Sequence, residues 1–294
     1  MPVRGDSGRD GFVDRARRHQ GRLLRGGLKL PDHVALDVSS VASGMTVAVG
    51  GYLEQNVPVA LLLAVADSGV RDLTVVAAPS ASLGVDLLVA AGVVDRVICP
   101  YVGFEGRGAG PALQREVASG RVERELCDQE ILVAGLRAAA QGCSCAPVLE
   151  TGSDSVQESP RVRTVTSPFD GSALTLAAAL PVDVALLHAQ VGDQSRNLYY
   201  WGSPFLDLMF AQASARVLTT VDTLVPVTSL ALTGPTISGV WVDAVTPCRD
   251  GAWPTASHGT HPEDKEAVED YLDHEKASAG SGVSRLHIRR GVLT

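Results

Sequence analysis

Two adjacent glycines, Gly50 and Gly51, follow an apolar run rich in β-branched residues, Met45 to Val49. Glycines at the carboxyl end of a strand let backbone amides approach an anion or a developing oxyanion, and the N-terminus of a following helix adds a favourable dipole. The spacing differs from the dinucleotide-binding fingerprint, which also needs an acidic residue further along. Because Gly-Gly turns are more often structural than catalytic, both interpretations stay open.

A second glycine-rich loop runs from Tyr101 to Gly110 and contains four glycines. Such a loop is either mobile or closely approached by a ligand. Glu105 is its only acidic residue. This carboxylate is a candidate general base, although a solvated loop acid is the favoured interpretation.

The histidines and cysteines provide weak candidates for chemistry. His188 ends an apolar run at the edge where an α/β sheet presents its ligands, but we interpret it as a half-buried structural histidine. His258 and His261 are spaced so that they can ligate a metal, yet no third ligand on a rigid element lies nearby in sequence, so we expect no metal site. The five cysteines include no Cys-x-x-Cys pair, which predicts reduced thiols.

The elements that position these residues alternate between short β-branched runs and longer helical stretches. This alternation predicts an α/β fold with an open, mostly parallel sheet and helices on both faces. Strands are expected at 45–49, 73–77, 96–99, 122–126, 182–188, 198–200, 217–221 and 240–245, and helices at 58–66, 82–91, 111–118, 129–140, 205–215 and 263–275. Residues 143–161 are expected to form a connecting loop. About the last 45 residues are expected to be weakly structured apart from the final helix.

Composition limits the class of protein. The chain has 294 residues, of which 45% are hydrophobic and 20% charged, so it can bury a substantial core and is not wholly disordered. It shows neither a bilayer-spanning apolar run nor a signal peptide, so we expect a cytoplasmic protein with no membrane partner. The net charge of −8 argues against nucleic acid as a partner. Residues 1–33 hold eight basic and four acidic side chains and are expected to be a flexible extension before one α/β domain at 34–294.

Several segments carry a more specific signal because they occur together in a fixed order. They are Gly44 to Gly51 followed by Pro58, Asp72 to Val76, Tyr101 to Gly103, Ala118 to Leu126, Leu180 to Ala189 and Val242 to Val245. In this order they resemble the alpha subunits of family I CoA-transferases over roughly residues 36–250. Further segments resemble the branch that holds the glutaconate CoA-transferase subunit and the actinobacterial cholesterol ring-opening hydrolase subunit, namely Thr164 to Phe169, His188 to Gln190 and Trp201-Gly202.

The resemblance implies the CoA-transferase fold and an alpha subunit that acts on an acyl-CoA thioester together with a beta subunit. In such enzymes the nucleophilic glutamate lies on the beta subunit, and the coenzyme A thioester is a substrate, so no bound cofactor is expected. The residues that it implies at the substrate site are Gly50, Gly51, Tyr52, Gln55, Asn56, Gly103 and Gln190, with the two adjacent glycines as amide donors to an oxyanion.

Two alternatives remain open at this stage. The first is a CoA-thioester C–C hydrolase or decarboxylase on the same scaffold, and the second is a non-catalytic regulatory or sugar-phosphate-binding protein. Several relatives carry Arg or Lys shortly after the Gly-Gly turn, where this chain has Glu54, Gln55 and Asn56. That difference disfavours an acyl group with a second carboxylate.

Overall fold

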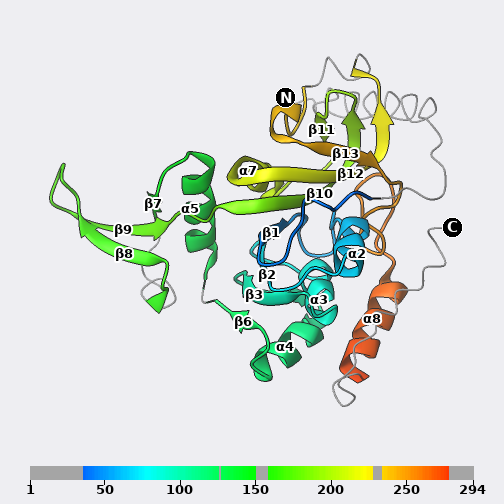
Figure 1. Cartoon of the computed structure of the whole chain (residues 1–294), viewed down its shortest axis with the longest axis horizontal. Helices are drawn as coiled ribbons and strands as arrows, with labels where there is room; N and C mark the ends of the chain where they lie inside the picture. The colour runs from blue at the N-terminus through cyan, green and yellow to red at the C-terminus, as the bar shows by residue number, and fades with distance from the viewer. Residues whose placement is uncertain (1–35, 126, 150–157, 228–233, 278–294) are drawn as a thin grey trace, which may run out of the picture.

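The computed structural model describes residues 36–125, 127–149, 158–227 and 234–277 (Figure 1). The basic extension expected at residues 1–33 lies outside this part of the chain. Within it, no helix is long and apolar enough to cross a bilayer.

A large sheet forms the centre of the protein, with strands in the order β13 (Ala244–Pro247), β12 (Ser214–Val225), β10 (Val182–Asp193), β1 (Thr46–Val49), β2 (Leu73–Ala77), β3 (Val94–Ile98) and β6 (Glu123–Arg124). Every neighbouring pair along this order is parallel. The short strand β11 (Leu198–Tyr199) adds an antiparallel pair to β10. The predicted mostly parallel sheet is therefore confirmed.

Helices cover both faces of this sheet, as predicted. The first face packs against α2 (Val59–Asp67), α3 (Leu83–Ala90), α4 (Pro111–Ala118) and α8 (Lys265–Ala277), and the second packs against α5 (Gln129–Ala140) and α7 (Asp207–Ala213). The alternation of side chains along β1 explains the two layers. Val47 and Val49 enter the first core and Ala48 enters the second, because successive residues of a strand point to opposite faces.

The order of strands in the sheet changes direction at β1: the next strands in sequence, β2 and β3, lie on one side of it, and the later strands β10 and β12 lie on the other. This strand lies between β2, the next strand in sequence, and β10, which returns from the second half of the chain. In open α/β sheets ligands bind beyond the carboxyl ends of the strands at such a switch point. β10 and β12 continue past the end of β1, since Val49 pairs with Leu186 while the β10–β12 ladder runs on to Asp193.

A separate antiparallel sheet projects from the side of α5 (Figure 1). It contains β7 (Cys145–Pro147), β9 (Ala173–Ala178) and β8 (Val162–Thr166), in that order. The prediction of a connecting loop over 143–161 is therefore wrong at β7, and residues 150–157 lie outside the described part. A three-residue strand is too short to produce a periodic sequence pattern.

Two further expectations need correction. The strand expected at 240–245 is a 3₁₀ helix (Gly239–Trp241) followed by β13. The segment between β13 and α8 is irregular but not weakly held, because Ala252, Thr255 and Ser257 are fully buried. Burial of irregular backbone depends on tertiary contacts, which a local sequence pattern does not record. The glycine-rich loop also contains a small hairpin, β4 (Gly103–Phe104) with β5 (Gly108–Ala109).

Candidate active site

The Gly-Gly turn directly follows β1 at the switch point. The Gly50 N–H donates to the carbonyl of Leu186 and the Gly51 N–H donates to Oδ1 of Asp207, each at 2.9 Å. A Cβ on Gly51 would lie 2.6 Å from the carbonyl oxygen of Gln55, and its φ is +84°. Both amides are thus engaged inside the chain, so any role for these glycines at a substrate site rests on the shape of the turn rather than on free amide donors.

A buried carboxyl group, that of Asp207 at the start of α7, is hydrogen-bonded to the backbone of this turn. It accepts hydrogen bonds from Gly51 and from the Tyr200 hydroxyl, the latter at 2.9 Å. Burial raises the pKa of Asp207 to about 7, and the two hydrogen bonds oppose that rise. The carboxyl group that anchors the turn therefore exchanges its proton near neutral pH.

Aromatic rings lie on the open side of the turn. The ring of Tyr52 stacks on that of Phe205, with centroids 3.7 Å apart and an angle of 16° between the planes. A shallow hollow beside them is lined by the two turn glycines, Tyr52, Ser82 and neighbouring apolar residues. Gln55 is exposed at the end of the same turn. Tyr52, which is partly exposed, therefore lines the hollow, and Gln55 lies exposed three residues further along the turn.

Two other residues expected at the substrate site, Asn56 and Gln190, are in direct contact. The Gln190 amide donates to Oδ1 of Asn56 at 2.7 Å and to the Ser257 hydroxyl at 3.2 Å. Its carbonyl oxygen accepts from the Trp201 N–H at 3.2 Å. Both amide side chains are buried. Because both side chains are buried and bonded to each other, they pack on the interior side of the turn and do not form its solvent-facing surface.

The polar contacts continue from Ser257 into the sheet. The Ser257 hydroxyl donates to Oδ2 of Asp222 at 2.6 Å, and His188 Nε2 lies 3.4 Å from the same oxygen. His188 Nδ1 lies 3.0 Å from the Thr220 hydroxyl. His188 is fully buried, so the expectation of a half-buried histidine is wrong. The expected strand ended at His188, whereas β10 continues past it.

A sequence signal for this group does exist. His188 and Gln190 are two residues apart on β10, Thr220 and Asp222 are two residues apart on β12, and His188 pairs with Thr220. Polar residues at alternate positions of apolar strands share one face of a sheet. This pattern was available in the sequence, but the pairing of the two strands was not.

A carboxyl group that the sequence did not single out for chemistry lies three residues after Gly51. Glu54 is buried, and burial raises its pKa, opposed by a hydrogen bond that its Oε1 accepts from the Glu105 N–H at 3.3 Å. The negative charge of Glu263 raises this pKa further, although Arg107 forms an ion pair with Glu263 at 2.7 Å. Glu54 is therefore better placed than an exposed acid to hold a proton.

The glycine-rich hairpin covers Glu54, as the contact with Glu105 shows. Glu105 itself is exposed after β4. The adjacent Gly103 is closely covered by Tyr101, because a Cβ there would lie 2.4 Å from the Tyr101 hydroxyl. The hairpin thus brings Glu105 next to the turn that carries Glu54, whereas the Gly103 N–H donates to the carbonyl of Ala81.

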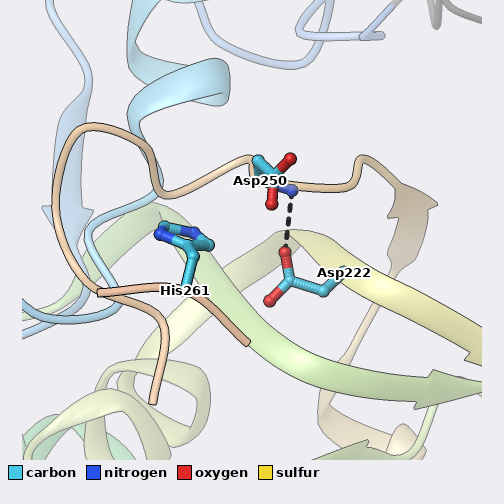
Figure 2. A group of neighbouring side chains, drawn as sticks. All are labelled: Asp222, Asp250 and His261. Atoms are coloured by element: carbon cyan, nitrogen blue, oxygen red, sulfur yellow. Dashed lines mark hydrogen bonds between the residues drawn. The ribbon is translucent and has the colours of Figure 1, made fainter. Parts of the chain in front are cut away.

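In the described part of the chain, one group of three side chains has carboxylate and imidazole atoms close enough together to bind a single metal ion. The group consists of Asp222, Asp250 and His261 (Figure 2). Their ligand atoms all lie within 4.8 Å of one another. The group adjoins the polar contacts described above through Asp222, which Ser257 also contacts.

These observations define an α/β protein with a candidate active site at the carboxyl edge of a parallel sheet, where a tight glycine turn meets buried carboxyl and amide groups. The family described as Coenzyme A transferase matches residues 32–247 of the chain. The chain belongs to this family.

Particular relatives differ in the reaction that their names state. The chain is 32% identical over 270 residues to the cholesterol ring-cleaving hydrolase IpdA subunit of Mycobacterium tuberculosis, covering 85% of this chain and 91% of that protein. It is similar to a variant of the decarboxylase AibA/AibB, with a TM-score of 0.73, 32% identity and coverage of 82% of this chain and 93% of that one. It is also similar to glutaconate coenzyme A-transferase from Acidaminococcus fermentans, with a TM-score of 0.75, 25% identity and coverage of 81% of each chain.

Proposed function

We propose that this chain is the alpha-type subunit of a heteromeric enzyme that transfers coenzyme A between an acyl-CoA thioester and a free acid. The observation that carries the proposal is the position of the Gly-Gly turn, which lies at the topological switch point with Asn56 and Gln190 fixed directly behind it. The family match and the names of the relatives, which are subunits or transferases, support the same assignment.

The partner in this proposal is a beta-type subunit that supplies the nucleophilic glutamate. That carboxylate attacks the thioester carbonyl and displaces the thiolate of coenzyme A, which leaves an acyl-glutamyl anhydride. The thiolate then attacks the glutamyl carbonyl of the anhydride and releases the donor acid as a free carboxylate. The resulting glutamyl-CoA thioester is resolved by a second acid through the same two steps in reverse. The alpha chain contributes the rim of Tyr52 and Gln55 around the acyl group. The acyl group carries no second carboxylate, because the turn offers the buried acid Glu54 in place of a cation.

A second function is C–C bond hydrolysis or decarboxylation of a CoA thioester. It is favoured by two findings: 32% identity to both a hydrolase and a decarboxylase, and the raised pKa of the Glu54 carboxyl group. A carboxyl group with a raised pKa is suited to proton transfer. Glu105, the acid predicted from the sequence, is the other candidate for this role.

The deciding experiment is an exchange assay on the chain co-purified with a beta-type subunit of the same family from the same genome. Radiolabelled coenzyme A supplied as acyl-CoA should appear in the thioester of an added free acid, and each subunit alone should be inactive. Thioester-dependent C–C cleavage or loss of CO₂ without exchange would select the second function. A stable complex that performs neither reaction would refute both.

Two isosteric variants then separate the carboxyl groups. In the second function, Glu54→Gln is expected to lower the rate of C–C cleavage at least about hundredfold, in the range of a lost proton-transfer group, whereas Glu105→Gln is expected to change it by only a few-fold. The Glu105 variant is a matched control because the substitution is the same and the residue lies against Glu54. The opposite order of effects would assign the proton transfer to Glu105.

A further inference from the structure

We propose that Asp222, Asp250 and His261 bind one divalent transition-metal cation of the type that accepts mixed oxygen and nitrogen ligands, such as Mn²⁺ or Zn²⁺. Asp222 lies on β12, whereas Asp250 and His261 both lie on the irregular segment between β13 and α8 (Figure 2). Their ligand atoms lie within 4.8 Å of one another. Of the two histidines that the sequence places close together, only His261 belongs to this group, and Asp222 and Asp250 supply the carboxylates that lie beside it.

The ring of His261 is oriented as in metal-binding histidines. Its Nδ1 lies 3.1 Å from the carbonyl oxygen of Pro262. Because a carbonyl only accepts, Nδ1 carries the hydrogen and Nε2 of the neutral ring presents its lone pair. Nε2 is buried and has no hydrogen-bond partner among the described residues. Donation of the second ring nitrogen to a carbonyl is the usual way to fix the tautomer of a metal ligand.

The backbone around His261 is held firmly. Its N–H donates to the carbonyl of Ser257, and the Ser257 N–H donates to the His261 carbonyl, each at 3.0 Å. Ser257 in turn donates from its hydroxyl to Asp222. The loop ligand is therefore tied to the strand ligand through a single fully buried residue.

A second, independent observation comes from the sheet side. His188 is fully buried, and the one polar atom that the described residues place against its Nε2 is Oδ2 of Asp222, at 3.4 Å, which is long for a hydrogen bond. Its other ring nitrogen contacts the Thr220 hydroxyl. Buried polar atoms are rarely left without a partner. Nε2 of His188 therefore faces the Asp222 carboxylate from the sheet side and helps to orient it toward Asp250 and His261.

The charges at the group also favour a cation. Asp222 and Asp250 bring two carboxylates close together, and like charges at this distance disfavour each other unless a positive charge lies between them. The ion pair that the structure shows for Asp250 is with Arg249, at 3.9 Å and with the arginine side chain 82% exposed. Each Asp222 oxygen accepts one short hydrogen bond, from the Asp250 N–H or the Ser257 hydroxyl, and retains lone-pair capacity.

An acidic cleft gives a cation access to the group. Asp250 and His261 line an open cleft of about 490 Å³ together with Glu263, Asp264 and Lys265. Metal-to-ligand distances of about 2.1 Å place the ligand atoms of a tetrahedral or octahedral site about 3.0–3.4 Å apart. The ligand atoms of the group lie within 4.8 Å of one another, so they move closer together on binding. The Asp250 side chain is 44% exposed and can make this movement.

The donor set selects the class of metal. Two carboxylates and one imidazole suit Mn²⁺, Fe²⁺ or Zn²⁺, whereas Mg²⁺ and Ca²⁺ prefer oxygen ligands throughout. Three protein ligands leave coordination positions open toward the cleft for water. Mn²⁺ is the better probe, because the exposed thiols of Cys143 and Cys145 attract Zn²⁺.

The test uses the full 294-residue chain without a polyhistidine tag, dialysed against chelator and titrated with Mn²⁺. The electron paramagnetic resonance signal of free Mn²⁺ reports how much metal is bound. We expect one saturable site per chain, and at least a tenfold loss of affinity in His261→Gln and in Asp250→Asn. The matched control is His258→Gln on the same loop, whose side chain is exposed and outside the group; its affinity is expected to stay within twofold.

Three outcomes would overturn the proposal: no saturable binding by the unsubstituted chain, unchanged affinity in both ligand variants, or an equal loss in His258→Gln. Asp250→Asn should fold normally, because that side chain is partly exposed, and its thermal unfolding midpoint without metal should be unchanged. A loss of Mn²⁺ affinity in this variant therefore cannot be attributed to misfolding. A rise of that midpoint with Mn²⁺ in the unsubstituted chain, absent in His261→Gln, provides a readout independent of the resonance signal.

Discussion

The protonation of Asp207 leads to a quantitative prediction about stability. This carboxyl group is buried beneath the Gly-Gly turn, and its pKa rises from 3.8 in the unfolded chain to about 7 in the folded protein. A raised pKa means that the folded state favours the protonated acid. The contribution to stability is therefore complete below about pH 4 and is lost as the pH rises to about 7.

The substitution Asp207→Asn should remove this loss. The amide keeps an oxygen that accepts from the Gly51 N–H and gains an NH₂ group that donates to the Tyr200 hydroxyl, as the protonated acid would. At about 1.4 kcal/mol for each pH unit, ionising Asp207 costs the folded state about 4 kcal/mol between pH 4 and pH 7. The variant should match the unsubstituted protein near pH 4 and exceed its stability by about that amount above pH 7.

Urea unfolding followed by circular dichroism at pH 4.5, 5.5, 6.5, 7.5 and 8.5 measures the difference directly. Tyr200→Phe provides a second check, because loss of the hydroxyl removes a hydrogen bond that favours the ionised acid and should shift the midpoint of the pH dependence upward. If the difference between Asp207→Asn and the unsubstituted protein stays constant from pH 4.5 to 8.5, Asp207 does not titrate in this range and the reasoning fails.

The remaining predictions concern the packing of the turn and its support. Gly51→Ala should destabilise by about 2–4 kcal/mol, since a left-handed φ combines with an overlap with the Gln55 carbonyl, whereas Gly44→Ala, with φ +81° and nothing within 4 Å, should cost only about 1 kcal/mol in the same urea assay. Equal losses of unfolding free energy in the two variants would show that the turn relieves the overlap between the new methyl group and the Gln55 carbonyl at no cost. Gln190→Leu should cost about 3 kcal/mol, because it leaves the buried Asn56 and the Trp201 N–H without their partners, and a loss below about 1 kcal/mol by denaturant unfolding would contradict that account.

Much of the fold could be predicted from the sequence, because the strands of the parallel sheet are buried on both faces and read as apolar β-branched runs. The run before Gly50 gives both β1 and the position of its turn. The two-residue strand β6 and the three-residue strand β7 lie at the limit of what a local pattern can indicate. The length of β12 was also missed, because Arg216 and Asp222 interrupt its apolar character while its hydrogen bonds to β10 continue.

The candidate site was predicted only in part, for a physical reason. The resemblance to the CoA-transferase family implied Gly50, Gly51, Tyr52 and Asn56 at one substrate site, and these residues are close together in the sequence. Burial depends on segments far apart in sequence. The Glu54 carboxyl group is buried where the hairpin after β3 covers it, and the sequence around Glu54 contains no record of that contact.

A series of hydrogen bonds connects the Gly-Gly turn, through Asn56 and Gln190, with the proposed metal site at Asp222. The Trp201 N–H donates to Gln190, the Gln190 amide donates to Asn56 and to Ser257, and Ser257 gives its single hydroxyl proton to Asp222. The series from Trp201 through Gln190 and Ser257 therefore ends at the Asp222 carboxylate, and the hydrogen bond to Asn56 branches from it at Gln190. Buried hydrogen bonds aligned in one direction polarise one another, so they are strongest when the final charge is fixed. A cation bound at Asp222 would hold that carboxylate in place and so hold Ser257 and Gln190. The rigidity of Asn56 behind the Gly-Gly turn then depends on a site at the far end of the same series.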